Sequence, residues 1–211
     1  MKIPYSFNDI TLFQFMQWHK IHSDKAMDKL DKDTHKLSIL TGKSFNDIEE
    51  LDFNTRSQLL AKARYMDNVP KDLRVPKRFT TGSTMLVPTM SIQEMKVNQL
   101  VDFYTIMKAH DNDFIAGANY ILAIMFKPFK LFGKAKYSPD DHSKISKLLL
   151  SAKVGDCLGL LFFYLNLWKR CEKIIVRYLE NNQKEIQTLM NEIANDKEYQ
   201  AFLANGDGNT I

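Results

Sequence analysis

Apolar residues recur every three to four positions along most of the chain, the spacing that lines one face of an α-helix. Charged side chains stand between them, so each helix is expected to bury one stripe and expose the other. Helix ends are marked by residues such as Gly42 and helix starts by residues such as Ser44. The pattern predicts helices over 11–30, 34–41, from 44 onward, 54–66, 91–110, 111–126 and 139–196, the last interrupted at 155.

The pattern changes between Val69 and Thr89, which hold three of the six prolines of the chain. Thr-rich stretches flank a Gly-Ser pair at 82–83 and favour a small β-hairpin or an extended arm. We therefore predict a mainly α, bundle-like fold of two helical units joined by this Pro/Thr-rich segment. The predicted parts are an N-terminal helical unit at 1–68, a linker or hairpin arm at 69–90, a C-terminal helical unit at 91–203 and a tail at 204–211.

One stretch, from Val154 to Trp168, has a composition close to that of a membrane span. Its 15 residues are fewer than the roughly 20 needed to cross a hydrocarbon core, and they include Asp156 and Asn166. A helix that is apolar all round is typical of a buried core, so we predict core here and no membrane span. Contact with a membrane or a hydrophobic partner is the alternative. The N-terminus has no apolar segment of the kind that a secretory signal needs.

Residue patterns that support catalysis or metal binding are sparse. His19 and His22 are three apart and precede several aspartates, but those aspartates alternate with lysines, as on a solvated helix end. The segment 111–113 starts like a calcium loop but lacks the later glycine and glutamate. No phosphate-binding glycine loop, dinucleotide fingerprint or nucleophile elbow occurs, and the two cysteines do not make a disulfide framework. We predict a non-enzymatic protein with no catalytic residues, metal site or cofactor.

The distribution of charge is more informative than the net charge of +4. The segment 62–78 contains six basic residues and two acidic ones, and the segment 127–136 contains four lysines and no acidic residue. The segment 180–211 has the opposite sign, with six acidic residues against two lysines. Three interpretations fit the basic segments: contact with nucleic-acid phosphates, a head-to-tail contact with the acidic end of a neighbouring copy, or an ordinary solvated surface.

Aromatic side chains beside these cations are expected to supply the apolar part of a protein interface. The candidate partner-binding residues are therefore Arg74, Lys77, Arg78, Phe79, Lys127, Phe129, Lys130, Phe132, Lys134, Lys136 and Tyr137.

The stretch from Lys36 to Leu51 reads KLSILTGKSFNDIEEL and is preceded by a helix start at 10–12. It resembles the N-terminal part of small virion-morphogenesis proteins of tailed bacteriophages, in which a helix, an Ile-Leu-Thr-Gly turn and a Ser/Thr-capped helix follow one another. The likeness covers residues 8–66, and the residues that carry it are structural.

The proteins that it resembles are often described as tail assembly chaperones, so the resemblance implies a role in virion morphogenesis. The leading prediction is a structural component of a tailed-phage virion, in the tail, the neck or a portal-proximal ring. Its partners would be other copies of the chain and other virion proteins, with assembly in the host cytoplasm and localisation in the virion. Two alternatives remain: a tail assembly chaperone that is absent from the mature particle, and a packaged or DNA-contacting virion protein whose basic loops meet DNA phosphates.

Overall fold

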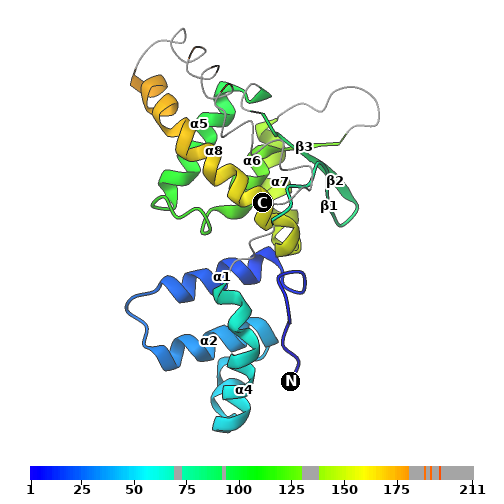
Figure 1. The fold of residues 1–211 in the computed structure, drawn as a ribbon, viewed down its shortest axis with the longest axis vertical. Helices are drawn as coiled ribbons and strands as arrows, with labels where there is room; N and C mark the ends of the chain where they lie inside the picture. The colour runs from blue at the N-terminus through cyan, green and yellow to red at the C-terminus, as the bar shows by residue number, and fades with distance from the viewer. Residues whose placement is uncertain are drawn as a thin grey trace. The chain divides into compact units, whose positions relative to one another are not determined.

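A computed structural model describes residues 1–68, 73–91, 94–129 and 138–180, together with positions 188, 191 and 195. The fold is mainly α-helical, as the periodicity predicts, with one small antiparallel sheet (Figure 1). The chain divides into two compact units: unit 1 is Met1–Lys71 with Leu150–Cys157, and unit 2 is Asp72–Leu149 with Leu158–Ile211. The hairpin segment thus belongs to unit 2, and a short later segment returns to unit 1.

Unit 1 is built from short helices that each begin at a capping side chain. Its elements are α1 (Leu12–Ser23), α2 (Lys29–Thr41), α3 (Phe45–Glu49), α4 (Phe53–Ala63) and the 3-10 turn η1 (Arg64–Asp67). At each of the four α-helix starts, a side-chain oxygen accepts a hydrogen bond from a backbone N–H of the first turn. The core cluster of this unit comprises Ile3, Leu37, Ile48 and Leu59.

The single helix expected over 11–30 is wrong, because a turn separates α1 from α2. The Asp24 carboxylate accepts hydrogen bonds from the N–H groups of Ala26 and Met27, at 2.8 and 3.2 Å. Such local bonds compete with the helical ladder, so the chain turns here. Helix α2 then ends at Gly42 as predicted, with a left-handed φ of 69°.

Unit 2 contains the sheet and the remaining helices. Its strands are β1 (Phe79–Thr81), β2 (Thr84–Pro88) and β3 (Phe126–Pro128), and its helices are α5 (Val97–Ala109), α6 (Ala118–Met125), η3 (Pro139–Asp141), α7 (His142–Leu150) and α8 (Val154–Glu180). The last residue of α7 and the first turn of α8 belong to unit 1. There, backbone bonds join Leu12 N–H to the Ala152 C=O at 2.8 Å and Val154 N–H to the Ile10 C=O at 3.1 Å.

The core of unit 2 lies between α5, α6 and α8. Most residues of α6 are buried, and the ring of Phe103 on α5 meets Trp168 on α8 edge-on, with centroids 4.9 Å apart. The apolar stretch 154–168 is mostly buried core. Among the residues described, no helix combines the length and the apolar character needed to cross a membrane.

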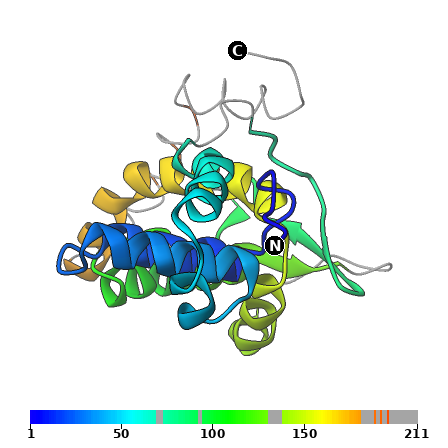
Figure 2. The same cartoon turned by 90° about the horizontal axis from the view of Figure 1, so that it is seen from below.

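The sheet has the order β1-β2-β3, and both pairs of neighbours are antiparallel. The predicted hairpin is confirmed, with Thr81 opposite Thr84 across the Gly-Ser turn. It projects from the helices of this unit in both views (Figure 1, Figure 2). The third strand was not predicted; Val87 of β2 pairs there with Lys127.

The helix starts expected in unit 2 are misplaced. The α-helix expected to begin at Ser91 begins at Val97, six residues later. Before it, the Glu94 N–H donates to the Ser91 C=O at 3.1 Å, and the Glu94 carboxylate lies 3.9 Å from Nζ of Lys127. The interruption of the long C-terminal helix, expected at Gly155, lies earlier, between the end of α7 at Leu150 and the start of α8 at Val154. Gly155 therefore stands in the first turn of α8.

The helix expected over 111–126 is shorter at both ends. Positive φ values at Asp111 and Asn112 place a turn before α6. At the other end the chain becomes extended at Phe126 and joins the sheet. The part of the predicted helix over 139–196 that follows residue 180 falls mostly outside the described residues.

Candidate interaction surface

Six of the eleven candidate partner-binding residues belong to the described part of the chain. Arg74, Lys77 and Arg78 precede β1 and are exposed. Lys127 lies on β3, and Phe129 follows it directly. Phe79 is the sixth. The other five lie outside the described residues: Lys130, Phe132, Lys134, Lys136 and Tyr137.

Phe79 is a core residue, which corrects its place among the candidates. Its side chain is 3% exposed, and its ring packs on Phe126 with centroids 5.2 Å apart. Alternate residues of a strand face opposite sides of a sheet, and the first residue of β1 faces inward. Phe79 is therefore not available to a partner.

The side of the sheet opposite Phe79 forms a small outward surface. Thr80 stands opposite Met85, and Val87 stands opposite Lys127, so these residues share one side. The Phe129 N–H donates to the Met85 C=O at 2.9 Å, which extends the pairing by one residue. We call this surface the outer sheet face and define it as Arg78, Thr80, Met85, Val87, Lys127 and Phe129.

An arginine and a phenylalanine from opposite edges of the sheet meet on this face. The guanidinium carbon of Arg78 lies 5.3 Å from the centroid of the Phe129 ring, within the range of a cation–π contact. Phe129 is 36% exposed and Met85 is 37% exposed. The apolar patch and the cation above it are thus already assembled before any partner binds. Such preorganisation lowers the entropic cost of binding.

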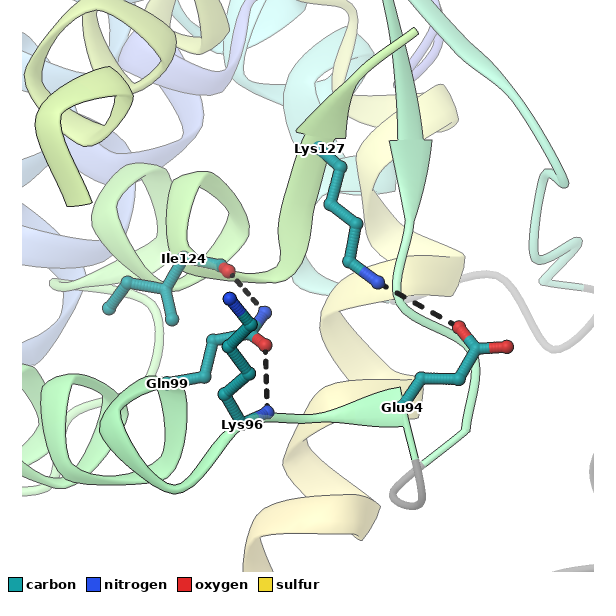
Figure 3. Close-up of polar contacts among 5 residues, drawn as sticks. All are labelled: Glu94, Lys96, Gln99, Ile124 and Lys127. Carbon is teal, nitrogen blue, oxygen red and sulfur yellow. Dashed lines mark hydrogen bonds and ion pairs between the residues drawn. The ribbon is translucent and has the colours of Figure 1, made fainter. Parts of the chain in front are cut away.

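The charge of Lys127 is partly offset within the chain. Its Nζ lies 3.9 Å from Oε2 of Glu94, and its side chain is only 16% exposed (Figure 3). The aliphatic stem of such a lysine covers apolar surface while the charged end reaches its partner. The accessible positive charge around the outer sheet face therefore comes mainly from Arg74, Lys77 and Arg78 among the described candidates.

A buried glutamine supports the strand that carries Lys127. Gln99 is fully buried; its Nε2 donates to the Ile124 C=O at 2.8 Å, and its Oε1 accepts from the Lys96 N–H at 3.2 Å (Figure 3). A helical carbonyl usually accepts from the N–H four residues later, but position 128 is a proline and has none. The Gln99 amide supplies that missing donor, and it joins the start of α5 to the end of α6.

The basic segment before β1 is fixed on helix α8. A Cβ built on Gly159 would stand 1.8 Å from the carbonyl oxygen of Arg74, so only glycine lets the two backbones approach this closely. The neighbouring Val75 is 6% exposed. Arg74 thus has an exposed side chain on an anchored backbone.

The constellations considered for metal binding have other contacts in the structure. The His22 Nδ1 lies 3.2 Å from Nζ of Lys36, which also stands 4.7 Å from the centroid of the Trp18 ring. Asp113 accepts hydrogen bonds from the backbone two and three residues further on. Within the described ranges, no group of three or more His, Cys, Asp or Glu side chains is placed to hold a metal ion. Burial raises the pKa of the Cys157 thiol, which keeps it protonated and unreactive.

Sequence reasoning missed Met85 and the role of Glu94. The alternation of the hairpin would have found Met85, because a two-residue turn fixes its position opposite Thr80. No local signal points to the contact between Glu94 and Lys127, since it depends on β3 joining the sheet.

Comparison with known proteins gives no relative from which a function could be transferred. No protein-family model, curated protein or solved structure matches the chain.

Proposed function

We propose that this chain is a non-enzymatic structural subunit of a tailed-phage virion, in the tail, the neck or a portal-proximal ring. It would act by binding other copies of itself and other virion proteins. The observation that carries the proposal is the outer sheet face, where Arg78 lies over Phe129 beside the exposed Met85. Arginine, aromatic residues and methionine are enriched in protein interfaces, whereas the exposed surface elsewhere favours lysine and acids.

The electrostatics of the chain also favour contact between copies. Three exposed cations precede β1, while other segments of the same chain carry a surplus of acid. Complementary charge on two different surfaces speeds encounter and selects the register in which two copies meet. The resemblance of residues 8–66 supplies the tailed-phage virion as the assembly to test.

Mass spectrometry of purified particles tests the proposal. A structural subunit is expected at a fixed ratio to other virion proteins after extensive washing. Presence in infected cells with absence from purified particles would contradict a structural role and would support the alternative of a tail assembly chaperone.

A DNA-contacting virion protein is the second candidate, favoured by the run of exposed cations at Arg74, Lys77 and Arg78. Binding to phosphates releases counterions, so each contact makes affinity fall with salt. This candidate predicts a gel shift that weakens steeply as salt rises and that Arg74→Gln weakens further. The structural-subunit proposal expects no shift at moderate salt.

A further inference from the structure

Unit 1 exposes two large apolar side chains at the starts of two neighbouring helices. Phe53, the first residue of α4, is 82% exposed, and Leu30, near the start of α2, is 64% exposed. A phenylalanine this exposed has almost no contacts within its own chain that would explain its presence. Clusters of solvent-exposed apolar side chains are contact sites more often than single exposed ones are.

Arg56 links the two helices that carry these exposed side chains. Its Nη2 donates to the Leu30 C=O at 2.7 Å and to the Thr34 Oγ1 at 2.5 Å. Arg56 stands three residues after Phe53, so both lie on one face of α4. Leu30 and Phe53 are therefore each adjacent to the same arginine, and the two helices lie beside each other in Figure 1.

Acidic residues surround this pair. The segments 28–33 and 47–56 together hold seven acidic residues and three basic ones, a net charge of −4. Asp28 and Asp52 cap the two helices directly beside Leu30 and Phe53. We call Leu30, Phe53 and the exposed acids beside them the α2–α4 surface; these acids are Asp28, Asp47, Glu49, Glu50 and Asp52.

We propose that the α2–α4 surface of one copy docks on the outer sheet face of a second copy. Phe53 is the apolar anchor, and Met85 and Phe129 are its counterpart. The acids around Phe53 then face the cations that precede β1. The inference rests on the proposed function, since it names the partner of the outer sheet face.

Charge selects this pairing over the symmetric ones. Two outer sheet faces would bring their arginines together, and two α2–α4 surfaces would bring their carboxylates together, which is repulsive in both cases. Pairing the two different surfaces satisfies both signs. Because each copy has both surfaces, the contact is heterologous and repeats from copy to copy, as a ring or a filament requires.

Each surface has only a few apolar side chains, so a single contact is expected to be weak and to form at high local concentration. Sedimentation velocity over a concentration series measures it. One variant breaks the outer sheet face (Arg78→Glu with Phe129→Ser), and another breaks the α2–α4 surface (Glu50→Lys with Phe53→Ser). The matched controls are Lys144→Glu and Tyr5→Ser, which change an exposed cation and an exposed aromatic elsewhere.

The parent chain and both controls are expected to self-associate. Each double variant alone is expected to have an affinity for itself that is at least about tenfold weaker. An equimolar mixture of the two double variants retains one intact contact, so it is expected to give heterodimers and nothing larger. A mixture that stays monomeric overturns the proposal, provided that circular dichroism shows parental helix content. A parent chain that stays monomeric also overturns it, while the particle analysis still tests the structural role independently.

The acidic segment 180–211 is the competing occupant of the outer sheet face. A full-length variant with Glu185→Gln, Glu192→Gln and Glu198→Gln reduces its charge and leaves the α2–α4 surface intact. We expect this variant to associate like the parent chain. The inference is overturned if this variant no longer associates while the variant with Glu50→Lys and Phe53→Ser still does. The outer sheet face would then be an interface with a different occupant.

Discussion

The two units of the molecule start their helices in different ways. In unit 1, each α-helix begins at a side chain that bonds its own first turn, as Ser44 does to the Asp47 N–H at 3.1 Å. In unit 2, α6 begins at Gly117 without a side-chain cap, and the start of α5 is held by Gln99, which reaches across to Ile124. All four α-helix starts of unit 1 thus have a local side-chain cap, whereas in unit 2 the side chain at the start of α5 also bonds a distant segment.

This difference has consequences for how each unit tolerates substitution. A local cap can be removed at a modest cost, because the rest of the helix keeps its packing. A contact that joins two elements is harder to replace, because the partner group stays buried and unsatisfied or the backbones must separate. The largest effects of mutation are therefore expected in unit 2.

Gly159→Ala should destabilise the chain most. Alanine is usually preferred to glycine within a helix by about 1 kcal/mol, yet here its Cβ would stand 1.8 Å from the backbone oxygen of Arg74. The segment before β1 would have to move away from α8, at a cost of about 2–3 kcal/mol. Chemical denaturation measures the change in the free energy of unfolding.

Gly155→Ala is the matched change on the same helix, in the turn that belongs to unit 1. Its Cβ would stand 1.7 Å from Oδ1 of Asn8, which is the end of a side chain and can rotate away. We expect a change within about 1 kcal/mol, since the helical preference for alanine offsets the adjustment. Equal destabilisation by the two substitutions would contradict the contrast between the units.

Gln99→Leu is expected to cost about 2 kcal/mol. The substitution keeps the buried volume but leaves the Ile124 C=O without its donor and the Lys96 N–H without its acceptor. Gln58→Leu, at an exposed position of α4, is the control and should change stability by less than about 0.5 kcal/mol. A neutral result for Gln99→Leu would show that the bridge between α5 and α6 does not hold them together.

The same contrast decides what could be predicted from the sequence. Gly42 and Ser44 act through their own neighbours, so their places at a helix end and a helix start were predicted correctly. Ser91 has an equally good local signal, but α5 begins only at Val97, and the Glu94 carboxylate pairs with Lys127 on β3. Pro128 indicated that the helix ends near residue 126, but nothing in the local pattern shows that the following residues pair with β2.

A matched pair of serine substitutions tests the role of local caps. Ser44→Ala removes the oxygen that accepts from the Asp47 N–H and should destabilise the chain by about 1 kcal/mol. Ser138→Ala makes the same change at a helix start of unit 2 where no side chain caps, and should have an effect below about 0.5 kcal/mol. Thermal unfolding followed by circular dichroism distinguishes the two, and the opposite order would contradict the account.

Lowering the pH should reduce the free energy of unfolding through groups of the two units in different pH ranges. These changes should be smaller than those of the substitutions above. Burial lowers the pKa of His142 in unit 2 below its ordinary value of 6.5, although three nearby aspartates oppose this. The unfolded chain therefore takes up this proton first, and stability falls as pH drops below about 6.5. In unit 1, the hydrogen bond from Ser44 lowers the pKa of Asp47 below 3.8, so its contribution is lost only as pH falls below that value.

Denaturation midpoints measured from pH 7.5 down to pH 3 test both directions. His142→Gln should flatten the curve just below about pH 6.5, and Asp47→Asn should flatten only its most acidic part. A curve for His142→Gln that follows the parent chain through the upper range would contradict the assignment of that range to His142.

The candidate site was predicted in part. Arg78 and Phe129 were both candidate partner-binding residues, in two separate basic segments, and the structure brings them together although 50 positions separate them. Phe79 was misassigned because composition does not show which side of a strand a residue faces. Phe53 gave no signal at all, since an aromatic residue at a helix start looks the same whether it is buried or exposed.

Covalent capture at Met85 tests most directly whether the outer sheet face contacts another copy. A photoreactive phenylalanine analogue replaces Met85 at the centre of that face, and the same analogue at Lys144 is the control. Illumination of the concentrated full chain, followed by peptide mapping, should give products joined to residues 28–33 or 47–56 of a second copy. Absence of such products, or an equal yield of them from position 144, would contradict the account.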